Sequence, residues 1–157
     1  LHSAHNKSEN IRKAKSFVAE AAGGGARLVA LPEVFTFRGM IRAEKGVKLS
    51  KTFFMERIAD EIPGPTIAEF QKLAAQYKIF ILAGSVYERS ADPERAYNAS
   101  VLVAGDGSIL QTYRKIHLFN AQVGGKKYCE SDYFLSGQDF QTARVGDFTV
   151  GMSVCYD

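Results

Sequence analysis

Apolar residues recur at helical spacing in two stretches of the chain, and these stretches predict two helices. In residues 8–22, Ser8 can cap a helix that the glycine run Gly23–Gly25 would end. In residues 65–77, Pro65 suits the first helical turn. The apolar positions are Ile11, Ala14, Val18, Ala21 and Ala22 in the first stretch, and Ile67, Phe70, Leu73, Ala74 and Tyr77 in the second. A short helix is also expected at 53–58.

Shorter apolar runs predict strands at 27–31, 78–86, 97–103, 108–114 and 148–155. Gly105-Asp106-Gly107 joins the third and fourth of them and favours a hairpin. Residues 120–139 are polar and are predicted to be irregular. Helices that alternate with strands, followed by a hairpin, indicate a layered α/β fold in one domain. Because the two helices can cover only one face of a sheet, we expect several apolar strand residues to be partly exposed: Val101, Val103, Val150, Met152 and Val154.

The composition is that of an ordinary soluble protein, with 46% hydrophobic and 24% charged residues. The net charge of +3 is spread along the chain without a basic cluster among aromatics, so we expect no nucleic-acid partner. The longest apolar run, 79–83, is too short to cross a membrane, and no signal peptide is visible. Cys129 and Cys155 are therefore expected to be free thiols in a cytoplasmic protein.

Three predicted strands end near a chemically reactive side chain. Glu33 follows Leu31-Pro32, Lys115 follows 108–114, and Cys155 ends 148–155. Sites in layered α/β folds form at strand ends, because the sheet holds the groups while loops leave space for a ligand. Taken singly, each residue has an ordinary explanation: a solvated loop carboxylate, a surface lysine, and a small buried thiol.

Other site types were weighed against this grouping. A Cys–His protease would need His117 beside Cys155, but no protease signature surrounds that cysteine. A zinc site from Cys129, Cys155 and His117 lacks a closely spaced ligand pair. Gly23–Gly25 follows a helix instead of preceding one, which disfavours a nucleotide cradle. We therefore expect neither a metal nor a cofactor.

The three segments together resemble the signatures of the nitrilase superfamily of carbon–nitrogen hydrolases. Leu31-Pro32-Glu33 resembles the first signature, residues 113–119 (Tyr-Arg-Lys-Ile-His-Leu-Phe) the second, and residues 151–157 (Gly-Met-Ser-Val-Cys-Tyr-Asp) the third. Glu130 stands where family members carry a further glutamate. The order and the separations agree as well, so the resemblance covers nearly the whole chain.

The resemblance implies a four-layer α-β-β-α sandwich. The family fold opens with a strand before the first helix and continues well beyond the cysteine motif. Residues 1–157 are thus expected to form a partial carbon–nitrogen hydrolase domain that lacks the first strand and the C-terminal part. The resemblance also implies that the full-length protein is a homo-oligomer.

The resemblance further implies a Glu-Lys-Cys triad that cleaves a non-peptide C–N bond in a small amide, N-carbamoyl amine or nitrile. Cys155 would be the nucleophile, Glu33 the general base, and Lys115 the stabiliser of the oxyanion together with the backbone N–H of Tyr156. Glu130 would position the substrate and Lys115. The choice of substrate would depend on the loops at 35–48 and 120–136 and on later residues.

One alternative of a different class stays open. If the natural protein ended at Asp157, it would be a non-catalytic fragment or a protein-interaction module with the same fold. The reading frame beyond Asp157 separates the two interpretations. In either case we expect the isolated 157-residue chain to be inactive.

Overall fold

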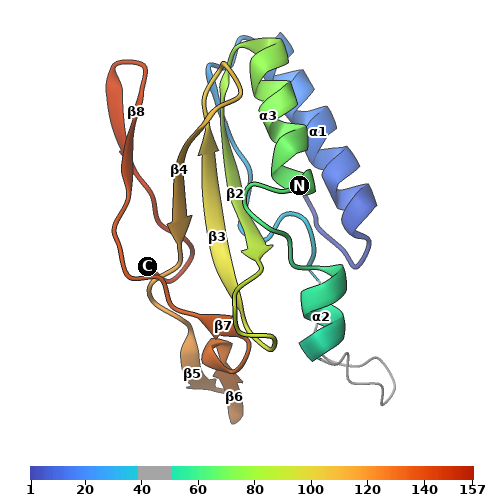
Figure 1. Ribbon diagram of the computed structural model, residues 1–157, viewed down its shortest axis with the longest axis vertical. Coiled ribbons are helices and arrows are strands. Elements are labelled where there is room, and N and C mark those ends of the chain that lie inside the picture. The colour runs from blue at the N-terminus through green and yellow to red at the C-terminus, as the bar shows by residue number, and fades with distance from the viewer. Residues whose placement is uncertain (39–50) are drawn as a thin grey trace.

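The computed structural model describes residues 1–38 and 51–157 and contains both predicted long helices (Figure 1). Helix α3 spans Pro65–Tyr77, as predicted, and α1 spans Lys7–Gly23. The expected cap of α1 is wrong by two residues: the side chain of Asn6, not Ser8, accepts a hydrogen bond from the N–H of Glu9. The short helix α2 spans Lys51–Arg57, close to the predicted 53–58. Within the described residues, no helix is both long and apolar enough to cross a membrane.

A mixed sheet of five strands forms the centre of the molecule. Its main order is β1-β2-β3-β4, with β1 parallel to β2 and the other neighbours antiparallel. The short strand β7 pairs in parallel with the first residues of β3. The bounds are Leu28–Ala30 for β1, Phe80–Glu88 for β2, Ala96–Val103 for β3, Ile109–Arg114 for β4 and Phe134–Leu135 for β7.

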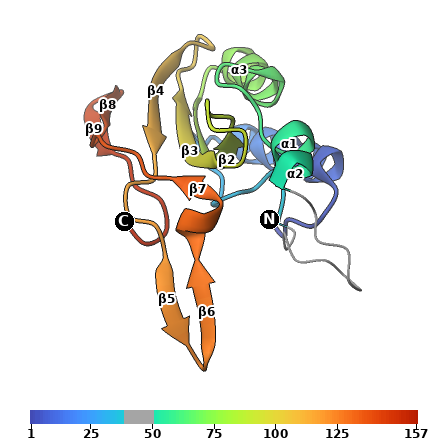
Figure 2. The ribbon, with the colours of Figure 1, turned by 60° about the horizontal axis from the view of Figure 1, so that its bottom comes forward.

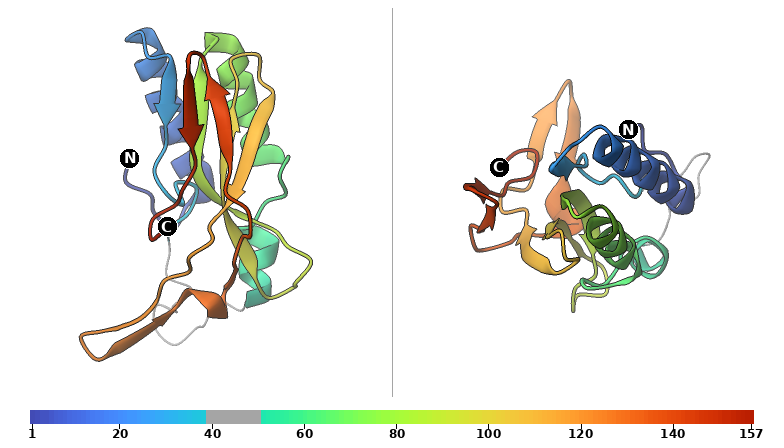
Figure 3. Two further views of the ribbon diagram at one scale, coloured as in Figure 1. Left: turned by 90° about the vertical axis from the view of Figure 1, so that its left-hand side faces the viewer. Right: turned by 90° about the horizontal axis from the view of Figure 1, so that it is seen from above.

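The sheet is covered on both faces. Helices α1 and α3 lie on one face, and a hairpin of β8 (Thr142–Val145) and β9 (Phe148–Gly151) lies on the other (Figure 3). The expected exposure of the strand residues is therefore wrong for four of the five. Val101 and Val103 are buried beneath the helices, and Met152 and Val154 pack with Leu102 and Tyr113 on the hairpin side. Val150 is half-buried.

The region predicted to be irregular, 120–139, contains regular structure. Strands β5 (Asn120–Val123) and β6 (Lys126–Cys129) pair as a hairpin that projects from the body of the molecule (Figure 2). Gly124 and Gly125 both have positive φ, 55° and 74°, which the tight turn of such a hairpin requires. A 3-10 turn, η2 (Glu130–Asp132), then leads to β7. The strand predicted at 148–155 is also too long: β9 ends at Gly151, and Cys155 lies in the following turn.

Candidate active site

Glu33 lies in a turn that β2 holds closely. The residue after it, Val34, has a positive φ of 44°, and its N–H donates to the buried Ser85 hydroxyl at 2.8 Å. A Cβ at Gly84 would stand 1.9 Å from the carbonyl oxygen of Leu31. Only glycine therefore permits β2 to approach the start of this turn, and the approach fixes the position of the Glu33 backbone.

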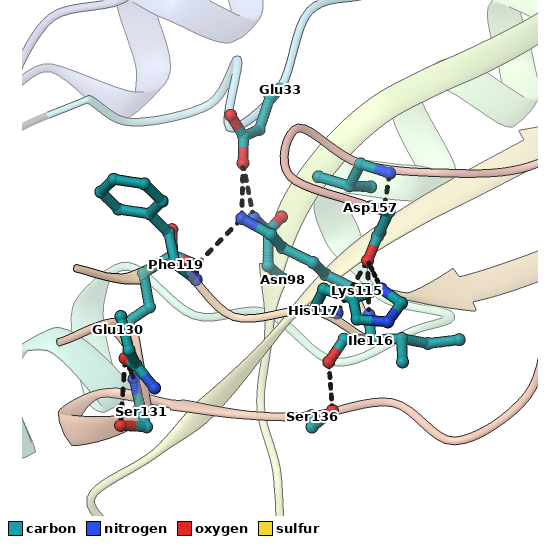
Figure 4. A network of polar contacts seen from close by, with 12 residues as sticks. Glu33, Asn98, Lys115, Ile116, His117, Phe119, Glu130, Ser131, Ser136 and Asp157 are labelled. Carbon is teal, nitrogen blue, oxygen red and sulfur yellow. Dashed lines mark hydrogen bonds and ion pairs between the residues drawn. The ribbon is translucent and has the colours of Figure 1, made fainter.

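Two buried side chains approach the Glu33 carboxylate (Figure 4), and the exposed Arg38 Nη2 lies 3.9 Å from its Oε2. The Asn98 side chain donates a hydrogen bond to Oε1 at 2.9 Å, and the Lys115 Nζ lies 3.7 Å from the same oxygen. Asn98 is 4% exposed, and among the described residues its side-chain oxygen has no hydrogen-bond partner. Asn98 therefore holds the carboxylate from β3 while its own acceptor stays unused.

Lys115 follows β4 directly and is completely buried. Its backbone N–H donates to the Asn98 carbonyl at 2.9 Å, and its carbonyl accepts from the Gly137 N–H at 2.8 Å. Its Nζ lies 2.9 Å from Oε2 of Glu130. A buried ammonium needs such pairing, because burial alone would favour the neutral amine.

Glu130 begins η2 and orients the lysine from the opposite side to Glu33 (Figure 4). Its Oε2 also accepts a hydrogen bond from the Phe119 N–H at 2.7 Å. Burial lowers the pKa of Lys115, but the hydrogen bond and charge of Glu130, with the charges of Cys155 and Glu33, outweigh burial and raise the net pKa. Lys115 is therefore an ammonium at neutral pH, between two carboxylates.

Cys155 lies in the turn after β9 with a positive φ of 53°. A non-glycine residue in this left-handed conformation is strained and persists only where its surroundings impose it. Burial of the thiol raises its pKa, as do the charge of Glu33 and a hydrogen bond to that residue, whereas the charge of Lys115 lowers it. The net pKa is raised, so the resting thiol is protonated at neutral pH.

The structure brings Glu33, Lys115 and Glu130 together, with Cys155 close enough for their charges to act on its thiol. The ring of Tyr156 is 62% exposed and packs edge-on against Phe119, with 5.4 Å between centroids. Among the described residues, no acceptor binds the backbone N–H of Tyr156, so it can face a ligand.

Cys129 and His117, the other two residues weighed as possible zinc ligands, lie in different parts of the structure. Cys129 ends β6, where it pairs with Asn120. The His117 ring contacts the Asp157 carboxylate at 3.2 Å and is mostly exposed. Within residues 1–38 and 51–157, no three histidine, cysteine or acidic side chains are grouped so as to hold a metal ion.

Three polar residues in and around this cluster were absent from the predicted set: Ser85, Asn98 and Asp157. Asn98 and Ser85 are polar side chains in mostly apolar strands, and that contrast is a signal in the sequence. Asp157 ends the third motif, but nothing in the sequence assigned it a partner. Its carboxylate accepts hydrogen bonds from the Tyr113 hydroxyl (2.7 Å) and from the N–H groups of Val154 (2.9 Å), Ile116 (3.1 Å) and His117 (2.8 Å).

Comparison with protein families gives a match to the carbon-nitrogen hydrolase model over residues 1–157. The chain belongs to the carbon–nitrogen hydrolase family. It is 35% identical over 152 residues to the human omega-amidase NIT2, covering 96% of this chain and 50% of that protein. It is 34% identical to the omega-amidase NIT2 of Danio rerio, covering 100% of this chain and 52% of the relative. The chain thus spans about half the length of the curated relatives that it matches.

Solved structures of the nitrilase superfamily show the same fold. The NitFhit protein of C. elegans superposes with a TM-score of 0.79 at 21% identity, covering 98% of this chain and 36% of that one. An amidase variant from Nesterenkonia sp. AN1, with acrylamide added to its active-site cysteine, superposes with a TM-score of 0.75 at 19% identity. That superposition covers 99% of this chain and 55% of the amidase. The predicted family and fold class are therefore confirmed.

Proposed function

We propose that the complete protein is an amidase that hydrolyses the C–N bond of a small amide through a covalent intermediate on Cys155. The observation that carries the proposal is the arrangement around Lys115, a fully buried ammonium between the carboxylates of Glu33 and Glu130. Burying such a group is costly unless it is paired. One carboxylate, that of Glu130, would be enough for a structural ion pair. The carboxylate of Glu33 is a second one, and its charge acts on both the Lys115 ammonium and the Cys155 thiol.

The raised pKa of Cys155 defines the first chemical step. Because the resting thiol is protonated, it needs a base at the moment of attack. Glu33 is held by Asn98 and its charge acts on the thiol, raising its pKa, so Glu33 takes the proton while the sulfur attacks the amide carbon. The C–N bond then breaks, the proton passes from Glu33 to the leaving ammonia, and a thioester remains on Cys155. Water activated by Glu33 releases the acid.

Lys115 supplies positive charge where the carbonyl oxygen becomes negative. It cannot lose its proton readily, since the neighbouring acidic groups raise its pKa. The backbone N–H of Tyr156, next to the nucleophile, is the second donor of this oxyanion hole. Glu130 holds the ammonium in place through the 2.9 Å contact and orients the bound substrate.

The substrate class is proposed from the relatives. The human and Danio rerio proteins are named omega-amidases, and the Nesterenkonia sp. AN1 protein is an amidase. We therefore rank a linear amide above an N-carbamoyl amine or a nitrile as the substrate. Of the loops expected to determine specificity, residues 39–48 of 35–48 lie outside the described residues, and 120–136 includes the β5–β6 hairpin.

The test is ammonia release by the complete natural protein from a panel of ω-amides of dicarboxylic acids, simple aliphatic amides, N-carbamoyl amines and nitriles. We expect turnover of at least one amide, and a thioester adduct on the peptide that contains Cys155 when the reaction is quenched early and analysed by mass spectrometry. Turnover that proceeds without an adduct on Cys155 would exclude the covalent route, and a panel without any turnover would exclude the amidase.

The 157-residue chain by itself is proposed to be inactive, and the complete protein to be a homo-oligomer. In a polypeptide of residues 1–157, Cys155 is exposed and lies in a turn two residues from a free end. Chain ends fray, so a catalytic geometry is hard to maintain there. The same ammonia assay on residues 1–157, beside size-exclusion chromatography of both lengths, tests both statements. Equal turnover by the two lengths would contradict the first statement.

A further inference from the structure

Two backbone segments of the candidate site come from different layers of the fold. Lys115 follows β4 of the main sheet, whereas Cys155 follows β9 of the hairpin on its outer face. The reaction proposed above needs the ammonium and the sulfur at a fixed separation, so the site depends on contacts that join the two layers.

The Asp157 carboxylate joins these two segments (Figure 4). One oxygen, Oδ1, accepts from the N–H groups of Ile116 and His117, the two residues directly after Lys115. The other, Oδ2, accepts from the N–H of Val154, the residue directly before Cys155, and from the Tyr113 hydroxyl in β4. The Asp157 side chain is 5% exposed, so water competes little for these bonds.

The same contacts account for the strained nucleophile turn. The N–H of Asp157 donates to the Val154 carbonyl at 3.2 Å, so the turn closes around Cys155, whose φ is +53°. A charged acceptor with several N–H donors forms strong bonds, and each bond here draws the turn toward the segment that follows Lys115. Strain at Cys155 is thereby balanced by contacts to its neighbours on both sides.

We propose that Asp157 is a positioning residue that fixes the Cys155 turn against the Lys115 segment. Its effect on the reaction rate rests on the hydrolysis proposed above. The carboxylate itself does not react. Its removal loosens the turn, so the sulfur spends less time facing Glu33 and Lys115. Misplacement of a catalytic group by about 1 Å costs about a hundredfold in rate.

The experiment uses the complete protein in a Cys129→Ser background, and alkylation by iodoacetamide is read by mass spectrometry on the peptide that contains Cys155, so that no other thiol contributes to the signal. Three variants are compared: Asp157→Asn, which keeps the shape but loses the charge; Tyr113→Phe, which removes one donor; and Asp106→Asn. Asp106 is the matched control, because its carboxylate holds a turn through Ser108 just before β4 begins, at the opposite end of the strand from Lys115. Alkylation rates are measured against pH, well below each melting temperature.

We expect Asp157→Asn to move the alkylation profile of Cys155 toward that of an unperturbed thiol, with a pKa of about 8.5. We also expect its kcat for the amide substrate to fall by about tenfold to a hundredfold, with a smaller change in KM. Tyr113→Phe should shift both quantities in the same direction by less, and Asp106→Asn should shift neither. If Asp157→Asn does not fold, Tyr113→Phe decides.

A folded Asp157→Asn protein with the wild-type profile and kcat would overturn the inference, as would an equal shift in Asp106→Asn. The alkylation readout needs no substrate. It therefore separates failure of this inference from failure of the proposed hydrolysis: a shifted profile in a protein that cleaves no amide would support the positioning role and reject the amidase.

Discussion

The main sheet and the β8–β9 hairpin contribute to one site in opposite ways. The sheet holds Lys115 with no exposed surface and fixes the Glu33 turn through Ser85 and Gly84. The hairpin carries Cys155, which is exposed, strained and held at its turn by a single carboxylate. The electrostatic environment is thus built by the densely packed layer, whereas Cys155, the proposed nucleophile, follows a two-stranded hairpin.

This difference separates two requirements of such a site. Charge stabilisation needs donors that do not reorganise during the reaction, and burial with several hydrogen bonds supplies that rigidity. A nucleophile must move by a bond length as the intermediate forms and decays, so it tolerates a less enclosed position. Substitutions in the two layers should accordingly fail in different ways.

The largest expected effect concerns the two thiols. In the complete protein, Cys155→Ser should abolish amide turnover, because the hydroxyl is a far weaker nucleophile beside Glu33. Cys129→Ser should keep most of the activity, since Cys129 belongs to the projecting hairpin. Steady-state ammonia release, with circular dichroism to verify folding, is the measurement. If both variants fold and lose the same share of turnover, Cys155 is not the nucleophile.

Lys115→Met comes next. The change keeps the length of the side chain but removes the charge, so kcat should fall by about a hundredfold or more, as it does when one oxyanion donor is lost. The carboxylates of Glu33 and Glu130 would also lose their shared cation, and the unfolding free energy should decrease. Kinetics below the melting temperature separate the two effects. A variant in which only KM rises would make Lys115 a residue for substrate binding.

Two phenylalanines compare how much the packing of α3 on the main sheet and the packing of the β8–β9 hairpin contribute to the free energy of unfolding. Phe70 is fully buried and packs edge-on against Phe35 at 5.1 Å, so Phe70→Ala should lower the unfolding free energy by about 3–5 kcal/mol. Phe148 at the start of β9 is 71% exposed, and Phe148→Ala should change the free energy of unfolding by no more than about 0.5 kcal/mol. Urea unfolding measures both. A large loss from Phe148→Ala in the complete protein would show that further residues cover the hairpin.

The smallest expected effect is a dependence of the free energy of unfolding on pH in the acidic range. Burial opposes ionisation of Asp157, but hydrogen bonds from His117, Tyr113 and Val154 outweigh it and lower its pKa. A carboxyl whose pKa is lowered on folding adds stability above its unfolded value of about 3.9, and that stability is lost as the pH falls through the folded value. Urea unfolding between about pH 5 and pH 3 should therefore show a shallower decline for Asp157→Asn than for the wild type. Parallel declines would mean that the carboxylate contributes nothing.

Most of the helix layer could be predicted from the sequence, because periodicity and local signals agree there. Pro65 marks the start of α3, and the apolar positions of both helices face the sheet as expected. The β5–β6 hairpin was not predicted, because its residues are mostly polar and exposed, so burial leaves no pattern on them. Its Gly124-Gly125 turn is the one local signal for a hairpin in this region.

The site was predictable only in part. The motif residues Glu33, Lys115, Glu130 and Cys155 were named, and the structure gathers them, but their catalytic roles stay predictions. What holds them was not predictable: Asn98 and Asp157 act across 65 and about 40 residues of sequence, through pairings that depend on the register of strands. The hairpin cover on the second face depends on the same long-range pairing, which explains the wrong expectation for Met152 and Val154.

The projecting β5–β6 hairpin divides the site along the chain. Lys126 and Lys127 sit beside its exposed turn, where a trypsin-like protease has easy access. A cut there leaves Glu33 and Lys115 on one piece and Glu130 and Cys155 on the other. We expect the pieces to stay paired, since β7 hydrogen-bonds to β3 and the Asp157 carboxylate binds the segment after β4. Two polypeptides divided at this turn would therefore have to reunite before Glu33, Lys115, Glu130 and Cys155 lie together again.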